Sequence, residues 1–251
     1  MTDLPIFLSL LWGTLLLRPY VFVFLLAFLA AASRDLGPAR ALGFLFWGWL
    51  VAFASEYTST RVGLPFGLYH YTGDTQGREL FLANVPFFDS LSFPFLAYAA
   101  YCLARHALGA ARGARVVLLA GVMMMLLDVV IDPLAVRGAR WFLGGIFFYP
   151  AGGIYFGVPL SNFAGWALVG WAIVGGYVAV SRGAAVAPGP GIGLYYGVLL
   201  FNLLITMWIG EWVLTGAGLL VHVIGFLVWY GFKGSVASAE SRAGLPPSPR
   251  P

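Results

Sequence analysis

Apolar segments close to the length of a membrane-spanning helix recur along this chain and constrain its fold more than any other feature. The segments 116–131, 164–180 and 192–210 each contain at most one charged residue, and connections with Gly, Pro and Arg separate them. About 20 apolar helical residues cross the hydrocarbon core of a bilayer. Charged residues make up 10% of the chain, against roughly 25% in soluble domains. The sequence therefore predicts an all-α, polytopic transmembrane helical bundle.

The apolar pattern predicts about seven spans, with six to eight allowed by the length of 251 residues. The first segment begins with a short interfacial piece, which Arg18 and Pro19 interrupt. We expect residues 1–234 to form a single domain and 235–251 to be a disordered cytoplasmic tail. The expected spans are 4–33, 38–57, 87–108, 116–131, 164–180, 192–210 and 215–232.

The basic residues give an orientation, because cytoplasmic loops carry an excess of Arg and Lys. With the N-terminus outside, nine of the 14 basic residues lie on the cytoplasmic side: Arg34, Arg40, Arg105, Arg112, Arg115, Arg182, Lys233, Arg242 and Arg250. We therefore predict a multi-pass protein of the cell (plasma or inner) membrane with a cytoplasmic C-terminus. The lipid bilayer is then the expected partner, and the net charge of +4 is no sign of nucleic-acid binding.

Carboxyl groups from different spans fall at one membrane level in this topology. Glu56, Asp89, Asp132 and Glu211 lie at the outer ends of spans, and Asp128 lies one helical turn deeper. Acidic side chains are costly inside a membrane and usually mark a functional site. We expect catalytic carboxyls among this group.

Asp128 and Asp132 are four residues apart and therefore share one helix face. Two close carboxylates tend to hold one proton between them, so the pair is a candidate general acid. The structural alternative is that Asp132 caps the following loop while Asp128 bonds a neighbouring helix. A magnesium-diphosphate site is disfavoured, because no DDxxD run or second acidic cluster with basic residues accompanies the pair.

Glu56 and Asp89 border the long connection EYTSTRVGLPFGLYHYTGDTQGRELFLANVPFFDS. Glu56 has a candidate partner in Arg61, whereas Asp89 serves equally well as a helix cap. His70 lies within this connection as an acid, base or ligand, or simply as a hydrogen-bonded loop residue. Asn162, Asn202 and Glu211 add polar groups that helix-to-helix hydrogen bonding explains equally well.

Aromatic side chains flank these polar groups: Tyr69, Tyr71, Phe87, Phe88, Phe93 and Trp166. Part of the aromatic content reflects interfacial belts. Electron-rich rings in a dry site also stabilise a cation by about 0.5 to 2 kcal/mol each.

Several chemistries lack their motifs in this chain. There is no glycine-rich phosphate loop, G-x-S-x-G or H-E-x-x-H. The single Cys102 excludes an internal disulfide, and three dispersed histidines make a histidine metal site improbable. We therefore expect neither a metal nor another cofactor.

Four motifs, EYTSTRVGLPFGLYHYT, VPFFDSLSF, LLDVVIDPLA and GVPLSNFAGW, resemble the CruF family of membrane carotenoid hydratases. That family includes carotenoid 1',2'-hydratases and bisanhydrobacterioruberin hydratases. The resemblance covers most of the chain and implies addition of water to the terminal C1=C2 double bond of an acyclic carotenoid, of the lycopene or γ-carotene type. Other carotenoid biosynthesis enzymes are then possible partners.

The hypothesis assigns protonation of the alkene to the Asp128/Asp132 pair and the positioning of water to Glu56 or Asp89, with the reverse assignment left open. Substrate contacts are expected from Arg61, Tyr69, His70, Tyr71, Phe88, Asn162, Trp166, Asn202 and Glu211. The alternatives are a carotenoid cyclase, a prenyl-transferring enzyme, and a proton-coupled transporter or lipid-binding membrane protein.

Overall fold

The computed structural model describes residues 4–110, 112–181 and 188–242, and eight α-helices account for most of them. Six helices are long and apolar enough to cross a membrane, and the bent pair α1/α2 would make a seventh. The predicted all-α polytopic bundle is confirmed. The helices are α1 (Leu4–Leu17), α2 (Pro19–Asp35), α3 (Pro38–Val62), α4 (Phe87–Leu108), α5 (Ala114–Ala135), α6 (Leu160–Val180), α7 (Gly189–Trp208) and α8 (Trp212–Arg242).

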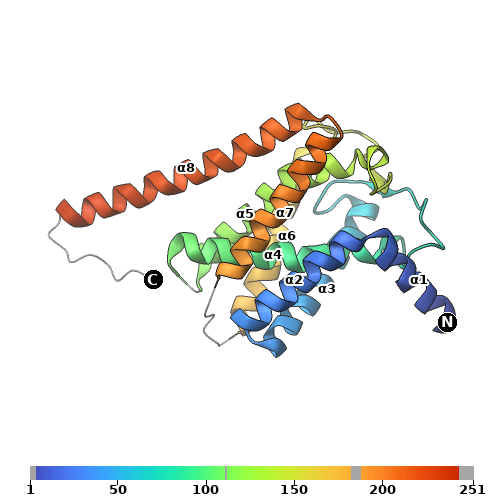
Figure 1. Cartoon of the computed structure of the whole chain (residues 1–251), viewed down its shortest axis with the longest axis horizontal. Coiled ribbons are helices and arrows are strands. Elements are labelled where there is room, and N and C mark those ends of the chain that lie inside the picture. The colour runs from blue at the N-terminus through green and yellow to red at the C-terminus, as the bar shows by residue number, and fades with distance from the viewer. Residues whose placement is uncertain (1–3, 111, 182–187, 243–251) are drawn as a thin grey trace.

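The first apolar segment turns sharply at Arg18. Pro19 occupies the first position of α2, where its missing N–H costs no helical hydrogen bond. The axes of α1 and α2 differ in direction by 90°, and Figure 1 shows α1 diverging from the bundle at this corner. The expected short piece ahead of a first span corresponds to α1.

Helix α4 is the centre of the bundle. In its most apolar window 78% of the residues are buried, against 17 to 50% in the other five spans. Its buried face includes small residues such as Ala97, Ala100 and Cys102, which let neighbouring helices approach closely. Across from Cys102, Gly191 of α7 leaves no room for a side chain, since a Cβ there would lie 2.4 Å from Sγ.

Helices α5 and α6 cross at a pair of glycines. A Cβ at Gly170 would come within 2.8 Å of the Gly121 Cα, and a Cβ at Gly121 would clash with Trp171. The missing side chains therefore allow the two backbones to touch, as small residues do in membrane helix pairs. This contact brings the end of α5 beside the start of α6.

Several helix boundaries differ from the predicted spans. Helix α3 continues to Val62 and ends at Gly63, which adopts the left-handed conformation with φ of 75°. Helix α5 runs through Asp132 and Pro133 to Ala135, because a proline in the last turn removes few of the helical hydrogen bonds. The last span is also longer, since α8 reaches Arg242 and overlaps the segment predicted as a disordered tail.

Two long connections fold back over one end of the bundle. Strand β1 (His70–Tyr71) pairs antiparallel with β4 (Phe147–Phe148), so the α3–α4 connection joins the α5–α6 connection. Strands β2 (Phe81–Leu82) and β3 (Val85–Pro86) form a second small ladder, and a 3₁₀ turn covers Gly138–Arg140. The connections thus cover the ends of α3 and α5 and the starts of α4 and α6.

Helix α8 packs beside α7 and α5 in its first half, contacts the end of α4 through Trp229, and projects away from the other helices beyond that point (Figure 1). Of the residues used for the orientation prediction, Arg182 and Arg250 lie outside the described residues. Arg105 is not a solvated loop residue, because its guanidinium is buried against Asp35 of α2 at 2.6 Å.

Candidate active site

A cavity of about 110 Å³ lies beneath the two connections, where the ends of α3 and α5 meet the starts of α4 and α6. Three carboxyl groups line it, those of Glu56, Asp89 and Asp132. The walls are otherwise mainly aromatic and apolar. Side chains on the wall include Tyr20, Phe24, Phe66, Tyr69, Phe88, Phe93, Tyr149, Asn162, Trp166, Phe201 and Asn202.

The first carboxyl pair joins α3 to α4. The Tyr71 hydroxyl lies 3.0 Å from Oε1 of Glu56 and 2.7 Å from Oδ2 of Asp89. The Ser90 hydroxyl donates to the other Glu56 oxygen. We refer to Glu56 and Asp89 as the first pair.

The pairing of β1 with β4 positions Tyr71 next to the first pair. In β1, Tyr71 faces Phe147 across the ladder while the neighbouring His70 faces Phe148. Because side chains alternate along a strand, Tyr71 turns toward the carboxyls and His70 is exposed. Tyr69, two residues earlier, lies on the same side, with its hydroxyl 3.3 Å from that of Tyr71.

Burial keeps these loop phenols neutral. Burial raises the pKa of Tyr71 well above its usual value, and the adjacent carboxyls of Asp89 and Glu56 raise it further. The pKa of Tyr69 is raised in the same way, first by burial and then by the same two carboxyls. Each hydroxyl therefore retains one proton to donate. One hydroxyl proton cannot serve both carboxyls at once, so a second proton is needed within the Tyr71 cluster.

The second carboxyl pair joins α5 to α6. The Asn162 amide nitrogen lies 2.7 Å from Oδ2 of Asp128 and 2.8 Å from Oδ2 of Asp132. The Trp166 indole nitrogen donates to the same Asp132 oxygen at 3.1 Å. Asn162 and Trp166 are four residues apart, so they share the face of α6 that meets α5. Asp128 and Asp132 are the second pair.

The members of the second pair differ in their access to the cavity. Asp132 lines the wall. Asp128 lies behind it, is fully buried, and has no partner for Oδ1 among the described residues. The face that the second pair presents to the cavity is therefore the Asp132 carboxyl with its two N–H donors.

Aromatic rings line the cavity that the two carboxyl pairs share. Trp166 stacks on Phe93 with ring centroids 4.4 Å apart and planes 8° apart, and Phe66 packs against both rings. Tyr149 of the second connection packs on Tyr69 at 5.8 Å. Its pKa is raised, mainly by burial and then by Asp132, so this phenol too stays neutral.

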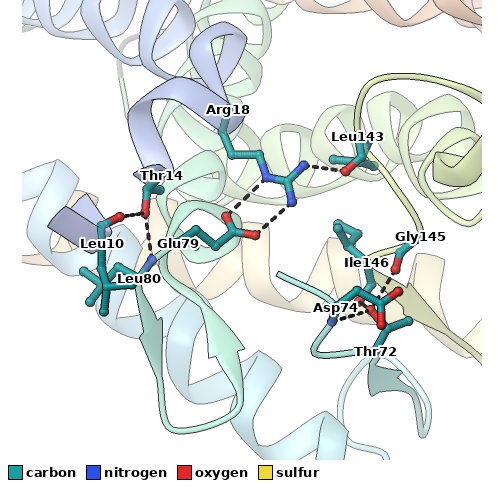
Figure 2. Close-up of polar contacts among 10 residues, drawn as sticks. All are labelled: Leu10, Thr14, Arg18, Thr72, Asp74, Glu79, Leu80, Leu143, Gly145 and Ile146. Atoms are coloured by element: carbon teal, nitrogen blue, oxygen red, sulfur yellow. Dashed lines mark hydrogen bonds and ion pairs between the residues drawn. The ribbon is translucent and has the colours of Figure 1, made fainter. Parts of the chain in front are cut away.

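A buried ion pair fixes the cover of the cavity (Figure 2). The Arg18 guanidinium bonds both oxygens of Glu79, at 2.9 and 3.3 Å, and also donates to the Leu143 carbonyl. It lies 4.4 Å from the ring centroid of Phe88. Nearby, the Thr14 hydroxyl accepts the Leu80 N–H at 2.8 Å. One arginine thus ties the α1/α2 corner to both connections.

Three residues expected at the site lie elsewhere. Arg61 does not pair with Glu56, since its guanidinium is exposed, stacks on Tyr57 and donates to Asn84. Arg61 lies five positions after Glu56 in the helix, which puts the two residues about 140° apart around the helix axis. His70 is exposed against Phe148.

Glu211 is the third residue that was expected at the site and lies elsewhere. It follows the turn between α7 and α8, where it forms ion pairs with Arg137 and Arg140 of the second connection. It shares a membrane end with the other acids but points away from them.

Sequence reasoning also missed residues. Arg18 was interpreted as an interruption, and Glu79 and Tyr149 were not singled out. The signal for Arg18 is its position inside an apolar segment, because a charge there needs a partner. Among the described residues, no group of three His, Cys, Asp or Glu side chains is placed to hold a metal ion.

Comparison with known proteins matches residues 12–226 to the model of a family described as carotenoid biosynthesis protein. This chain belongs to the carotenoid biosynthesis protein family. Within the curated proteins, it is 33% identical over 123 residues to bisanhydrobacterioruberin hydratase of Haloarcula japonica. That match covers 48% of this chain and 39% of the relative, so the chain aligns with less than half of the relative's length. No solved structure matches the chain significantly.

Membership in the carotenoid biosynthesis family agrees with the resemblance found in the sequence motifs. All four motifs lie within the matched residues. They also contribute Glu56, Tyr71, Asp89, Asp132 and Asn162 to the same cavity region.

Proposed function

We propose that this protein adds water to the terminal C1=C2 double bond of an acyclic carotenoid, of the lycopene or γ-carotene type. The observation that carries the proposal is the pairing of carboxyls from three helices, α3, α4 and α5, around one aromatic cavity. Family membership and the name of the hydratase relative support a carotenoid substrate. No redox change is required, because hydration adds one H₂O and leaves the electron count unchanged.

The first step is protonation of carbon. A carboxylic acid O–H gives its proton to C2 of the alkene, the π bond breaks, and a tertiary cation forms at C1. The first pair suits this step, because both Glu56 and Asp89 line the cavity and the single Tyr71 hydroxyl proton cannot serve both carboxyls, which calls for a proton on one of them. Proton transfer by a positioned acid typically contributes 10²- to 10⁴-fold to a rate.

The second step is capture of the cation by water. The water oxygen bonds to C1 and releases a proton, which the Asp132 carboxylate accepts. Two N–H groups, from Asn162 and Trp166, point at the Asp132 oxygen and stabilise its charged form. The structure thus favours the reverse of the assignment preferred from the sequence. Transfer of the proton back to the first pair restores the starting state.

The aromatic walls of the cavity stabilise the tertiary cation formed in the first step. Stacked Trp166 and Phe93 lie beside Asp132, and dry aromatic faces stabilise a cation by about 0.5 to 2 kcal/mol each. The polyene body has a route between α2 and α7, where half-buried Tyr20, Phe24 and Phe201 stack at the cavity edge. A substrate dissolved in the bilayer would enter from that side.

We also propose the orientation with the N-terminus outside and the C-terminus cytoplasmic, in the cell membrane. It places the acidic cavity in the outer half of the bilayer. The excess of Arg in the opposite connections supports it. Labelling of single cysteines introduced near each end would test this arrangement.

The test of function is the pigment made by a lycopene-producing host that expresses the chain. Hydration predicts a product heavier by one water, with ¹⁸O in the hydroxyl when cells grow in H₂¹⁸O. Cyclisation instead gives an isomer of unchanged mass. The absence of any product with added water, both in this host and in one that makes γ-carotene, refutes the proposal when the protein is present in the membrane.

A further inference from the structure

A second cavity, of about 250 Å³, lies at the opposite end of the bundle. It takes its walls from the end of α4, the start of α7 and the middle of α8, with α5 behind. The acidic cavity instead uses the start of α4 and the end of α7. The two sites therefore occupy different halves of the membrane, and none of the proposed hydration chemistry uses the second one.

His222 is a half-buried polar side chain of this cavity, whereas His106 and Tyr196, which also line it, are exposed. Its Nδ1 lies 2.8 Å from the Gly218 carbonyl oxygen. A carbonyl oxygen can only accept, so Nδ1 carries the proton. A neutral imidazole has one N–H, which leaves Nε2 as an acceptor.

The neighbouring phenol does not satisfy that acceptor. The Tyr195 hydroxyl lies 3.0 Å from the Met123 carbonyl and 3.4 Å from Nε2 of His222. Its single proton is directed to the nearer carbonyl. Among the described residues, the contact that Nε2 makes is this 3.4 Å approach of a hydroxyl whose proton goes to Met123, and His222 lines the cavity.

The size and walls of the cavity restrict what supplies that donor. A water molecule needs roughly 10–15 Å³ of such space and two to four polar partners, whereas this cavity is far larger and mainly apolar. Around it, Val223, Phe226 and Leu227 of α8 are exposed as lipid-facing residues are. A molecule entering from the bilayer with a hydrocarbon body and one O–H group fits both features.

We propose that this cavity binds a lipid alcohol, whose hydroxyl donates to Nε2 of His222 while its hydrocarbon body lies along α8. Trp229 closes one side, with its indole nitrogen bonded to the Ala107 carbonyl at 3.0 Å. The inference stands on these contacts and does not depend on the hydratase proposal.

The experiment measures saturable binding of tritiated geranylgeraniol to the full chain in nanodiscs. The matched competitor is phytane, a branched hydrocarbon of the same carbon count without the hydroxyl. We expect phytane to compete at least tenfold more weakly than unlabelled geranylgeraniol. His222→Phe, which keeps an aromatic ring and removes the acceptor, should weaken binding at least tenfold.

Gly225→Leu provides a second variant that keeps His222. A Cβ at Gly225 lies at an ordinary 3.8 Å from Leu126, so the larger side chain can extend into the cavity and should also abolish binding. Asp132→Asn, in the other cavity, should bind normally. Equal competition by phytane, or binding within twofold of the native chain in His222→Phe and Gly225→Leu, overturns the proposal.

Discussion

The Tyr71 hydroxyl offers a graded test of the first carboxyl pair. Tyr71→Phe removes the hydroxyl that contacts Glu56 and Asp89 but leaves both carboxyls and the ring. Glu56 keeps its hydrogen bond from Ser90, so the pair loses part of its support. A hydrogen bond to a charged group contributes about 1.5 to 3 kcal/mol. At about 1.4 kcal/mol per tenfold, the rate should fall about ten- to a hundredfold.

The assay is the initial rate of hydroxylated pigment formation in membranes supplied with lycopene, normalised to the amount of protein. Tyr155→Phe is the matched control, because the Tyr155 hydroxyl is buried with no partner among the described residues. It should retain the native rate. A Tyr71→Phe rate within twofold of native would show that this hydroxyl does not organise the pair.

Three further predictions concern stability. Glu79→Gln leaves the buried Arg18 charge unpaired and should lower the free energy of unfolding by about 3 to 5 kcal/mol. The double variant that adds Arg18→Met should be more stable than Glu79→Gln alone. Unfolding in nanodiscs measures both variants, and a loss below 1 kcal/mol in Glu79→Gln refutes the prediction. Asn162→Leu leaves two carboxyls without their shared donor and should destabilise the protein by about 2 kcal/mol or more. The Asn202 amide bonds a carbonyl of its own helix, so Asn202→Leu should destabilise the protein less. Equal losses in the two variants would contradict the shared contact. Because the folded pKa of Tyr71 lies above the unfolded value of about 10, the contribution of Tyr71 to stability should be constant below pH 10 and fall above it by up to about 1.4 kcal/mol per pH unit. The slope of stability against pH above 10 should therefore be smaller in Tyr71→Phe than in the native chain, and equal slopes would exclude this cause.

The sequence predicted the bundle because length and hydropathy determine which segments can cross a membrane. It also predicted that acids at span ends occupy one level, and Glu56, Asp89 and Asp132 do reach one cavity. The membrane depth of a residue does not determine which way its side chain points around the bundle. Glu211 shares the level yet pairs with Arg137, and the five-residue spacing to Arg61 already placed that residue on another face of its helix.

The features that sequence reasoning missed depend on long-range contacts. Arg18 meets Glu79 at a separation of 61 residues and the Leu143 carbonyl at 125. Neither the helical nor the strand period reports such pairs. Tyr149 reaches the cavity because two connections pair as β1 and β4, which two-residue strands do not reveal in advance.

The most direct test of the account replaces one carboxyl in each pair and measures the mass of the pigment formed. Glu56→Gln and Asp132→Asn should each abolish the product that is heavier by one water, while protein levels in the membrane and lycopene content stay as in the native strain. Hydroxylated carotenoid at the native level in either variant would contradict the claim that both carboxyl pairs act on one double bond.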